Sequence, residues 1–90
     1  MKELINEKSF TEKDWISAVS LIGELNRNAE AASLSQNALQ LFPGSSYLHY
    51  LLGRSWLDDH PNKARKELQK AVRHDPSNEE AAIMLKQRFK

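Results

Sequence analysis

The side chains best suited to chemistry stand together at Asp58, Asp59 and His60, where two carboxylates adjoin an imidazole. Such a group could hold a metal ion or share a proton-transfer reaction. Turn chemistry explains the same residues, because Asp is favoured in turns and Pro61 follows directly. The chain has no cysteine, no glycine-rich phosphate loop and no sign of a serine, histidine and aspartate triad. We therefore expect no enzyme, no metal and no cofactor, and we expect His49 to be a partly buried core residue.

Length and composition indicate one ordinary folded domain over residues 1–90. Ninety residues suffice for one compact domain and are too few for two. Apolar residues make up 40% of the chain and the formal net charge is +1, which argues against disorder and against a strongly basic nucleic-acid binder. The N-terminal stretch MKELINEKSF has no export signal, and no apolar run approaches the roughly 18 residues of a membrane helix. A soluble, cytoplasmic protein without membrane insertion is the expectation.

The elements that must position these residues are helices. Helical runs alternate with clusters of Pro, Gly, Asn and Asp, and no stretch alternates long enough to predict a strand. Thr11 with Asp14 forms a capping-box pattern before the first run, and Ser77 with Glu80 forms one before the last. The pattern predicts an all-α fold with helices at about 12–25, 29–41, 46–57, 61–74 and 79–90.

A repeat of constant period runs through these helices. Positions 64 − 31, 71 − 38 and 76 − 43 all give 33, and each pair holds the same residue type. The second copy reads, in order, His49, Leu52, Gly53, Trp56, Ala64, Leu68, Ala71 and Pro76. This resembles the tetratricopeptide repeat (TPR), whose pattern is W-x₂-L-G-x₂-Y, A-x₃-F and a closing proline over about 34 residues. The first copy, from Trp15, is looser, with Val19 where a small residue is expected and Ser35 where a large apolar one is.

The resemblance implies antiparallel helix pairs stacked as a short TPR-like α-solenoid with a C-terminal capping helix. About two and a half repeats fit the chain, at about 12–45, about 46–78 and, as a capping or partial-repeat helix, 79–90. Small residues such as Gly53 and Ala64 would let paired helices approach closely, with large side chains filling the space beside them. Trp15 and Trp56 are expected to pack in the core, since both fall on the packing stripe of their helices.

The resemblance also implies a function. TPR proteins are mostly non-enzymatic and hold a segment of a partner protein in a concave groove formed by the first helices of successive repeats. We therefore expect a protein-protein interaction module with a protein or peptide partner, although the two tyrosines among the groove positions could merely cover a small core. Carried over by position, the groove residues are Lys13, Ile16, Ser20, Tyr47, Tyr50, Arg54, Leu57, Ile83 and Gln87.

One known ligand of the family is not expected. Some members clamp the C-terminal carboxylate of heat-shock chaperones with lysines, asparagines and an arginine. The corresponding positions offer no comparable set of donors, because they hold Ile16, Ser20, Leu51, Glu80 and Met84.

The last helix suggests an alternative function. Arrays of this type usually need about three repeats to bury a continuous core. Ala82, Leu85 and Phe89 could cap the second repeat, but Ile83 and Met84 point elsewhere. These two could form a self-association surface, giving a homodimer or scaffold element, or they could meet further repeats if the chain is a fragment of a longer array.

A basic stripe on the fourth helix is a second candidate surface. Lys63, Lys66, Lys70 and Arg73 fall on one helical face and could contact nucleic acid or an acidic partner. Glu67 lies among them in the sequence, and the outer helix of a repeat pair normally shows a solvated face. A solvated face is the expectation, and nucleic acid is not expected as a partner.

Overall fold

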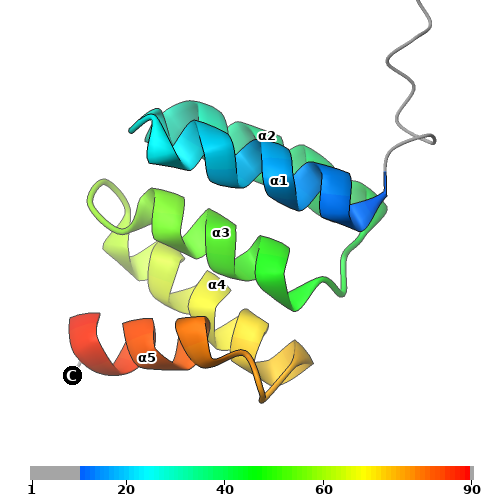
Figure 1. Cartoon of the computed structure of the whole chain (residues 1–90). Coiled ribbons are helices and arrows are strands. Elements are labelled where there is room, and N and C mark those ends of the chain that lie inside the picture. Colours follow the sequence, from blue (N-terminus) through cyan, green and yellow to red (C-terminus); the bar gives the residue numbers. More distant parts are fainter. Residues whose placement is uncertain (1–10, 90) are drawn as a thin grey trace, which may run out of the picture.

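The computed structural model describes residues 11–89, which form five α-helices joined by short turns (Figure 1). No strand occurs among these residues, so the all-α prediction is confirmed. Residues 1–10 and 90 of the predicted domain lie outside the described range. The helices are α1 Glu12–Glu24, α2 Asn28–Leu41, α3 Ser46–Trp56, α4 Pro61–His74 and α5 Glu79–Arg88.

The first helix begins at the predicted capping box. The amide of Asp14 donates to the Thr11 hydroxyl oxygen at 3.2 Å, and the amide of Thr11 donates to the Asp14 carboxylate at 2.9 Å. After α1 the chain reverses at Asn26, whose φ of 62° lies in the left-handed region that asparagine tolerates. The second helix then starts at Asn28, one residue earlier than predicted, and its N-cap residue Arg27 makes no side-chain cap.

The predicted cap of the last helix is wrong by one residue. The side chain of Asn78, rather than Ser77, accepts from the amide of Ala81 at 3.2 Å. The Ser77 hydroxyl instead donates to the Asp75 carboxylate at 2.6 Å, so it takes part in the preceding turn. Both residue types are good caps, and the competing bond to Asp75 decides between them.

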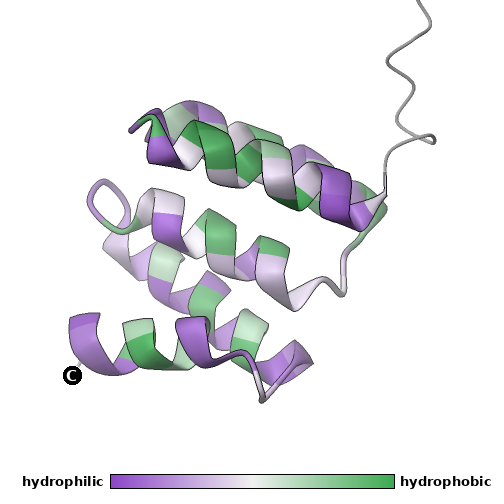
Figure 2. Ribbon diagram, viewed as in Figure 1, coloured by the Kyte–Doolittle hydropathy of each residue, from purple (hydrophilic) through white to green (hydrophobic). Residues whose placement is uncertain are grey.

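Each helix packs on the next along the chain, and α1 also contacts α3. Figure 1 shows α5 at the opposite end of the molecule from the α1 and α2 pair. In Figure 2 the middle of α5 is hydrophobic and both of its ends are hydrophilic. The core is built from leucines, alanines and a valine without solvent exposure, namely Val19, Ala31, Ala38, Leu48, Leu51, Ala64, Leu68, Ala71 and Ala81.

Helices α3 and α4 approach closely at Gly53. A methyl group added there would lie 2.9 Å from Cγ of Leu68 and 3.1 Å from the backbone oxygen of Ala64. Ordinary carbon contacts are about 3.5–4.0 Å, so only glycine fits between these helices without displacing a neighbour. The small residue at this position therefore sets the spacing of the pair.

The two tryptophans differ in their surroundings. Trp15 is buried, with 7% of its surface exposed, as predicted. The prediction of core packing is wrong for Trp56, which is only half-buried. Trp56 is the last residue of α3, where its ring meets the edge of His60 at 6.1 Å and the Lys63 ammonium at 5.4 Å. These two ring contacts are therefore with the turn after α3 and the first turn of α4.

Candidate functional site

A hollow of about 210 Å³ opens between α3 and α5. Three predicted groove residues line it, together with Met84 from the predicted self-association surface and with Glu80, which the groove prediction missed. Half of the Ile83 side chain is exposed here, at 50%. The complete lining is Tyr50, Glu80, Ile83, Met84 and Gln87.

Tyr50 both covers the core and lines the hollow. Its exposed fraction is 7%, and it belongs to the same buried cluster as Leu48 and Leu51. The ring of Tyr47 is tilted against it at a centroid distance of 5.2 Å and is half-buried. Desolvation by burial, and after it the negative charge of Glu80, raises the pKa of Tyr47 above its ordinary value of 10.0. The hydroxyl of Tyr47 therefore stays protonated at neutral pH and can donate a hydrogen bond.

Arg54 bridges the surface from α3 to α1. Its guanidinium lies 5.8 Å from the centre of the Tyr50 ring. On its other side it is so close to Gly23 that a methyl group there would lie 2.7 Å from Nη2 of Arg54. Within residues 11–89 no carboxylate forms an ion pair with this arginine. A half-buried guanidinium held by a ring and a backbone, without an anion beside it, is available to an incoming acceptor.

Four of the remaining predicted groove residues lie outside the lining of the hollow. Ile16 and Leu57 are half-buried and pack against the core. Ser20 is half-buried and Lys13 is exposed, both on α1. None of these four lines the hollow between α3 and α5.

Gly23 is the residue of this candidate site that sequence reasoning missed most clearly. A glycine inside a helical pattern costs stability, so it usually marks a close approach. That signal was present in the sequence, but its partner Arg54 lies on another helix and could not be named from the pattern.

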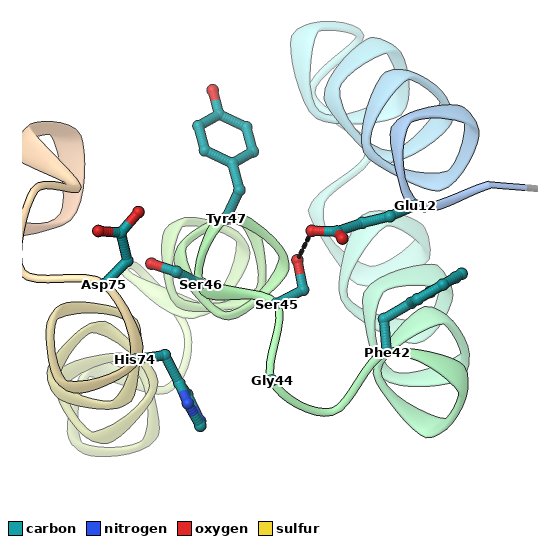
Figure 3. Close-up of a pocket in the computed structure, with 8 residues that line it drawn as sticks. All are labelled: Glu12, Phe42, Gly44, Ser45, Ser46, Tyr47, His74 and Asp75. Atoms are coloured by element: carbon teal, nitrogen blue, oxygen red, sulfur yellow. Dashed lines mark hydrogen bonds between the residues drawn. The ribbon is translucent and has the colours of Figure 1, made fainter.

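A larger hollow, of about 520 Å³, lies at the N-terminal end of α3 (Figure 3). The Ser45 hydroxyl donates to the Glu12 carboxylate at 2.5 Å across it, while Tyr47 points away from the other labelled side chains. The carboxylate of Asp75, also in its lining, accepts from the hydroxyl and the amide of Ser77, and these bonds lower the pKa of Asp75. Both carboxylates are thus engaged at helix ends, which gives this hollow a structural role.

A polar link joins three helices beside that hollow. The Ser46 hydroxyl donates to the backbone oxygen of Ala71 at 2.6 Å and accepts from the Asn78 amide at 2.7 Å. All three residues are buried. The start of α3, the end of α4 and the N-cap of α5 are therefore held by one hydroxyl.

A buried ionisable pair connects α3 with α4. Nδ1 of His49 lies 2.8 Å from a carboxylate oxygen of Glu67, and Nε2 lies 3.0 Å from the backbone oxygen of Pro43. Both partners are acceptors, so a doubly protonated ring satisfies both and a neutral ring only one. Lys70 donates to the second Glu67 oxygen at 3.2 Å, and the ring of His74 stacks on His49 at 5.2 Å.

The hydrogen bonds of this pair determine the charge of Glu67. Desolvation is the largest single influence and raises its pKa, but the bonds from His49 and Lys70 together outweigh it, so the pKa of Glu67 falls below 4.5. Glu67 is therefore ionised at neutral pH. The prediction that His49 is a buried core histidine is confirmed, because its exposed fraction is 8%.

Metal binding or proton transfer by the turn residues after α3 gains no further support from the described part of the chain. Asp58, Asp59 and His60 are exposed, and residues 11–89 contain no group of three or more His, Asp or Glu placed to hold a metal ion. Among the same residues, every helix is too short or too polar to cross a membrane.

Comparison of the chain with models of known protein families, with curated proteins and with solved structures gave no match.

Proposed function

We propose that the chain is a non-enzymatic protein-interaction module that binds a segment of a partner protein along α1, α3 and α5. The observation that carries this proposal is the hollow between α3 and α5, together with the guanidinium of Arg54, which lies over the Tyr50 ring of its lining and has no ion-pair partner among residues 11–89. An apolar recess next to a fixed donor is the usual composition of a binding hot spot.

We also propose that the five helices form a TPR-like array, with repeat bounds at about 45 and 78. Two observations support this arrangement. Each bound of α4 lies 33 residues after the same bound of α2, and each helix packs on its neighbour in the chain. In such an array α1, α3 and α5 lie on one side, which agrees with Arg54 of α3 reaching Gly23 of α1.

The lining of the site indicates how a partner segment would be held. An apolar side chain of the partner enters the hollow against Ile83 and Met84, with the ring of Tyr50 below it. Arg54 donates two hydrogen bonds to a carboxylate or a backbone oxygen of the same segment. The Tyr47 hydroxyl, which stays protonated, is a further donor at the edge.

The test is an affinity capture from lysate of the source cells with three forms of the protein: wild type, Arg54→Glu and Arg27→Glu. Arg27 is the matched control, because it is exposed, is paired with Glu30 at the start of α2 and does not line the hollow. A partner held by the wild type and the control but lost with Arg54→Glu supports the groove. Capture of the same proteins by all three forms refutes it. Circular dichroism first establishes that all three forms are folded.

Self-association is a second candidate function. It rests on Ile83, which is the exposed large apolar residue of α5 and lies next to the half-buried Met84. In this case Ile83→Glu lowers the particle mass measured by light scattering, whereas Arg54→Glu leaves the mass unchanged. A monomeric wild-type protein at high concentration excludes this function. The cytoplasmic location stays a prediction.

A further inference from the structure

The outer face of α4 carries one sign of charge. All of its lysines and arginines are exposed, and they span the helix from its first turn to its last. Its single acidic residue, Glu67, is buried, with an exposed fraction of 9%. The exposed cations are Lys63, Arg65, Lys66, Lys70 and Arg73.

The structure corrects the sequence-based view of Glu67. In the sequence this residue interrupts the basic stripe and favours an ordinary mixed, solvated surface. In the fold its carboxylate points inward, where His49 holds one oxygen and Lys70 reaches the other from the rim. No carboxylate of α4 is therefore left on the outer face to neutralise Lys66 and Arg73.

The face has a definite size and shape. From Lys63 to Arg73 the helix rises about 15 Å, at 1.5 Å per residue. Four of the five cations, Lys63, Lys66, Lys70 and Arg73, are three or four residues apart, so they recur about once per turn. A hollow of about 410 Å³ opens on the same side, lined by Asn62, Arg65, Lys66 and Gln69. The two cations of this lining can only donate hydrogen bonds and are positively charged. The two side-chain amides are uncharged and can both donate and accept.

We infer that this face binds an acidic helical segment of a partner protein. A helix with a carboxylate at each turn repeats with the same pitch of about 5.4 Å as the cations of α4, so several charge pairs can form together. Such a segment needs only the length of one helix. The surface shares no residue with the hollow between α3 and α5, so this inference stands independently of the proposed groove.

Nucleic acid fits this face less well than an acidic helix. The cations of this face all come from α4, and α2 would not extend the face, because it has no lysine or arginine. The Trp56 ring, at the end of α3, is only partly exposed and already contacts Lys63 and His60. Strong phosphate binding uses about six to ten contacts, and single-strand binding adds stacked bases.

The test measures fluorescence anisotropy with three labelled probes at low salt, about 20 mM, and near physiological salt. The first probe is a helical peptide of alanine and glutamate with one glutamate per turn. The second has glutamine in place of each glutamate, and the third is a single-stranded oligothymidine. We expect the whole protein to bind the glutamate peptide at low salt, to lose most of this binding at physiological salt, and not to bind the glutamine peptide.

The variants make the result specific to α4. The double variant Lys66→Glu/Arg73→Glu should weaken binding of the glutamate peptide at least about tenfold, since each substitution turns an attraction into a repulsion. The control Arg27→Glu/Lys86→Glu changes the net charge equally at exposed sites on α5 and before α2, and should bind within about twofold of wild type. All four positions are exposed, so the fold should persist, and circular dichroism checks this.

Three outcomes would overturn the inference. One is the absence of salt-dependent binding of the glutamate peptide by wild type. Another is an equal loss of peptide binding in the control variant Arg27→Glu/Lys86→Glu, which would mean that net charge alone explains the weakening. The third is tighter binding of the oligothymidine than of the peptide with the same dependence on Lys66 and Arg73, which would assign the face to nucleic acid.

Discussion

Replacing Gly53 by alanine should destabilise the protein, although alanine is the better helix former. The added methyl group would meet Cγ of Leu68 at 2.9 Å, another Leu68 carbon at 3.1 Å and the backbone oxygen of Ala64 at 3.1 Å. Leu68 is fully buried, so it has little room to turn away. The Ala64 oxygen moves only if α4 moves, which means that the two helices must separate.

Two opposing contributions determine the size of the effect. Overpacking of a filled core costs about 1–3 kcal/mol. Alanine in a helix interior gains about 0.8–1 kcal/mol over glycine. Because one of the close atoms belongs to the backbone, we take the upper part of the overpacking range, and the net loss is then about 1–2 kcal/mol. For a domain of this size that lowers the melting temperature by about 5–15 °C.

The assay is urea unfolding followed by circular dichroism, with Gly44→Ala as the matched control. Gly44 has no atom within 4 Å of an added methyl group, and no glycine in residues 11–89 has a positive φ. That control should be neutral or gain up to about 1 kcal/mol, through a more restricted unfolded chain. If Gly53→Ala is as stable as wild type or more so, helix propensity dominates at this site, and the contact between α3 and α4 is looser than the distances imply.

Three further substitutions test the polar contacts and the groove. Ser46→Ala leaves the buried side-chain amide of Asn78 without its acceptor and should cost about 1–3 kcal/mol in urea unfolding, whereas a cost below about 0.5 kcal/mol would contradict this role. The folded-state pKa of Glu67 is lowered, so its charge stabilises the fold above about pH 4.5 and this stability is lost as pH falls further. Unfolding curves from about pH 6 to 3 should therefore fall more steeply for wild type than for Glu67→Gln, and parallel curves would refute the assignment. Gly23→Ala should displace the flexible end of Arg54, weakening partner capture with little change in melting temperature, and unchanged capture would separate Arg54 from binding.

Local signals in the sequence predict most of the helix boundaries. The fourth helix was predicted at its observed bounds, because Pro61 suits a first helical position and Asp75 with Pro76 ends the run. The capping box at Thr11 was also found, since both of its bonds join residues three apart. The cap of α5 was missed because adjacent Ser77 and Asn78 both suit the position, and the contact of Asn78 with Ser46, 32 residues away, is tertiary.

The candidate site was less predictable, because its decisive features depend on contacts between helices. The groove positions carried over from the resemblance to the TPR pattern include Tyr50 and Ile83, which line the observed hollow. Those positions gave no means of joining Arg54 to Gly23, 31 positions earlier on another helix. Glu67 looked like a surface charge among lysines, and only the nearness of His49 on α3 shows why it turns inward.

The position of α5 has a consequence for the motions of the protein. In residues 11–89 this helix packs chiefly on α4, whereas α3 lies between α2 and α4 and holds more buried residues than any other helix. Amide hydrogens of α5 should therefore exchange with solvent through local opening, while those of α3 exchange only in global unfolding. The hollow is thus formed by α3, whose amides should be among the best protected from exchange, and by α5, whose amides should be among the least protected. A ligand that fills it should slow hydrogen exchange mainly in α5, so binding there would be measured as the ordering of a single helix.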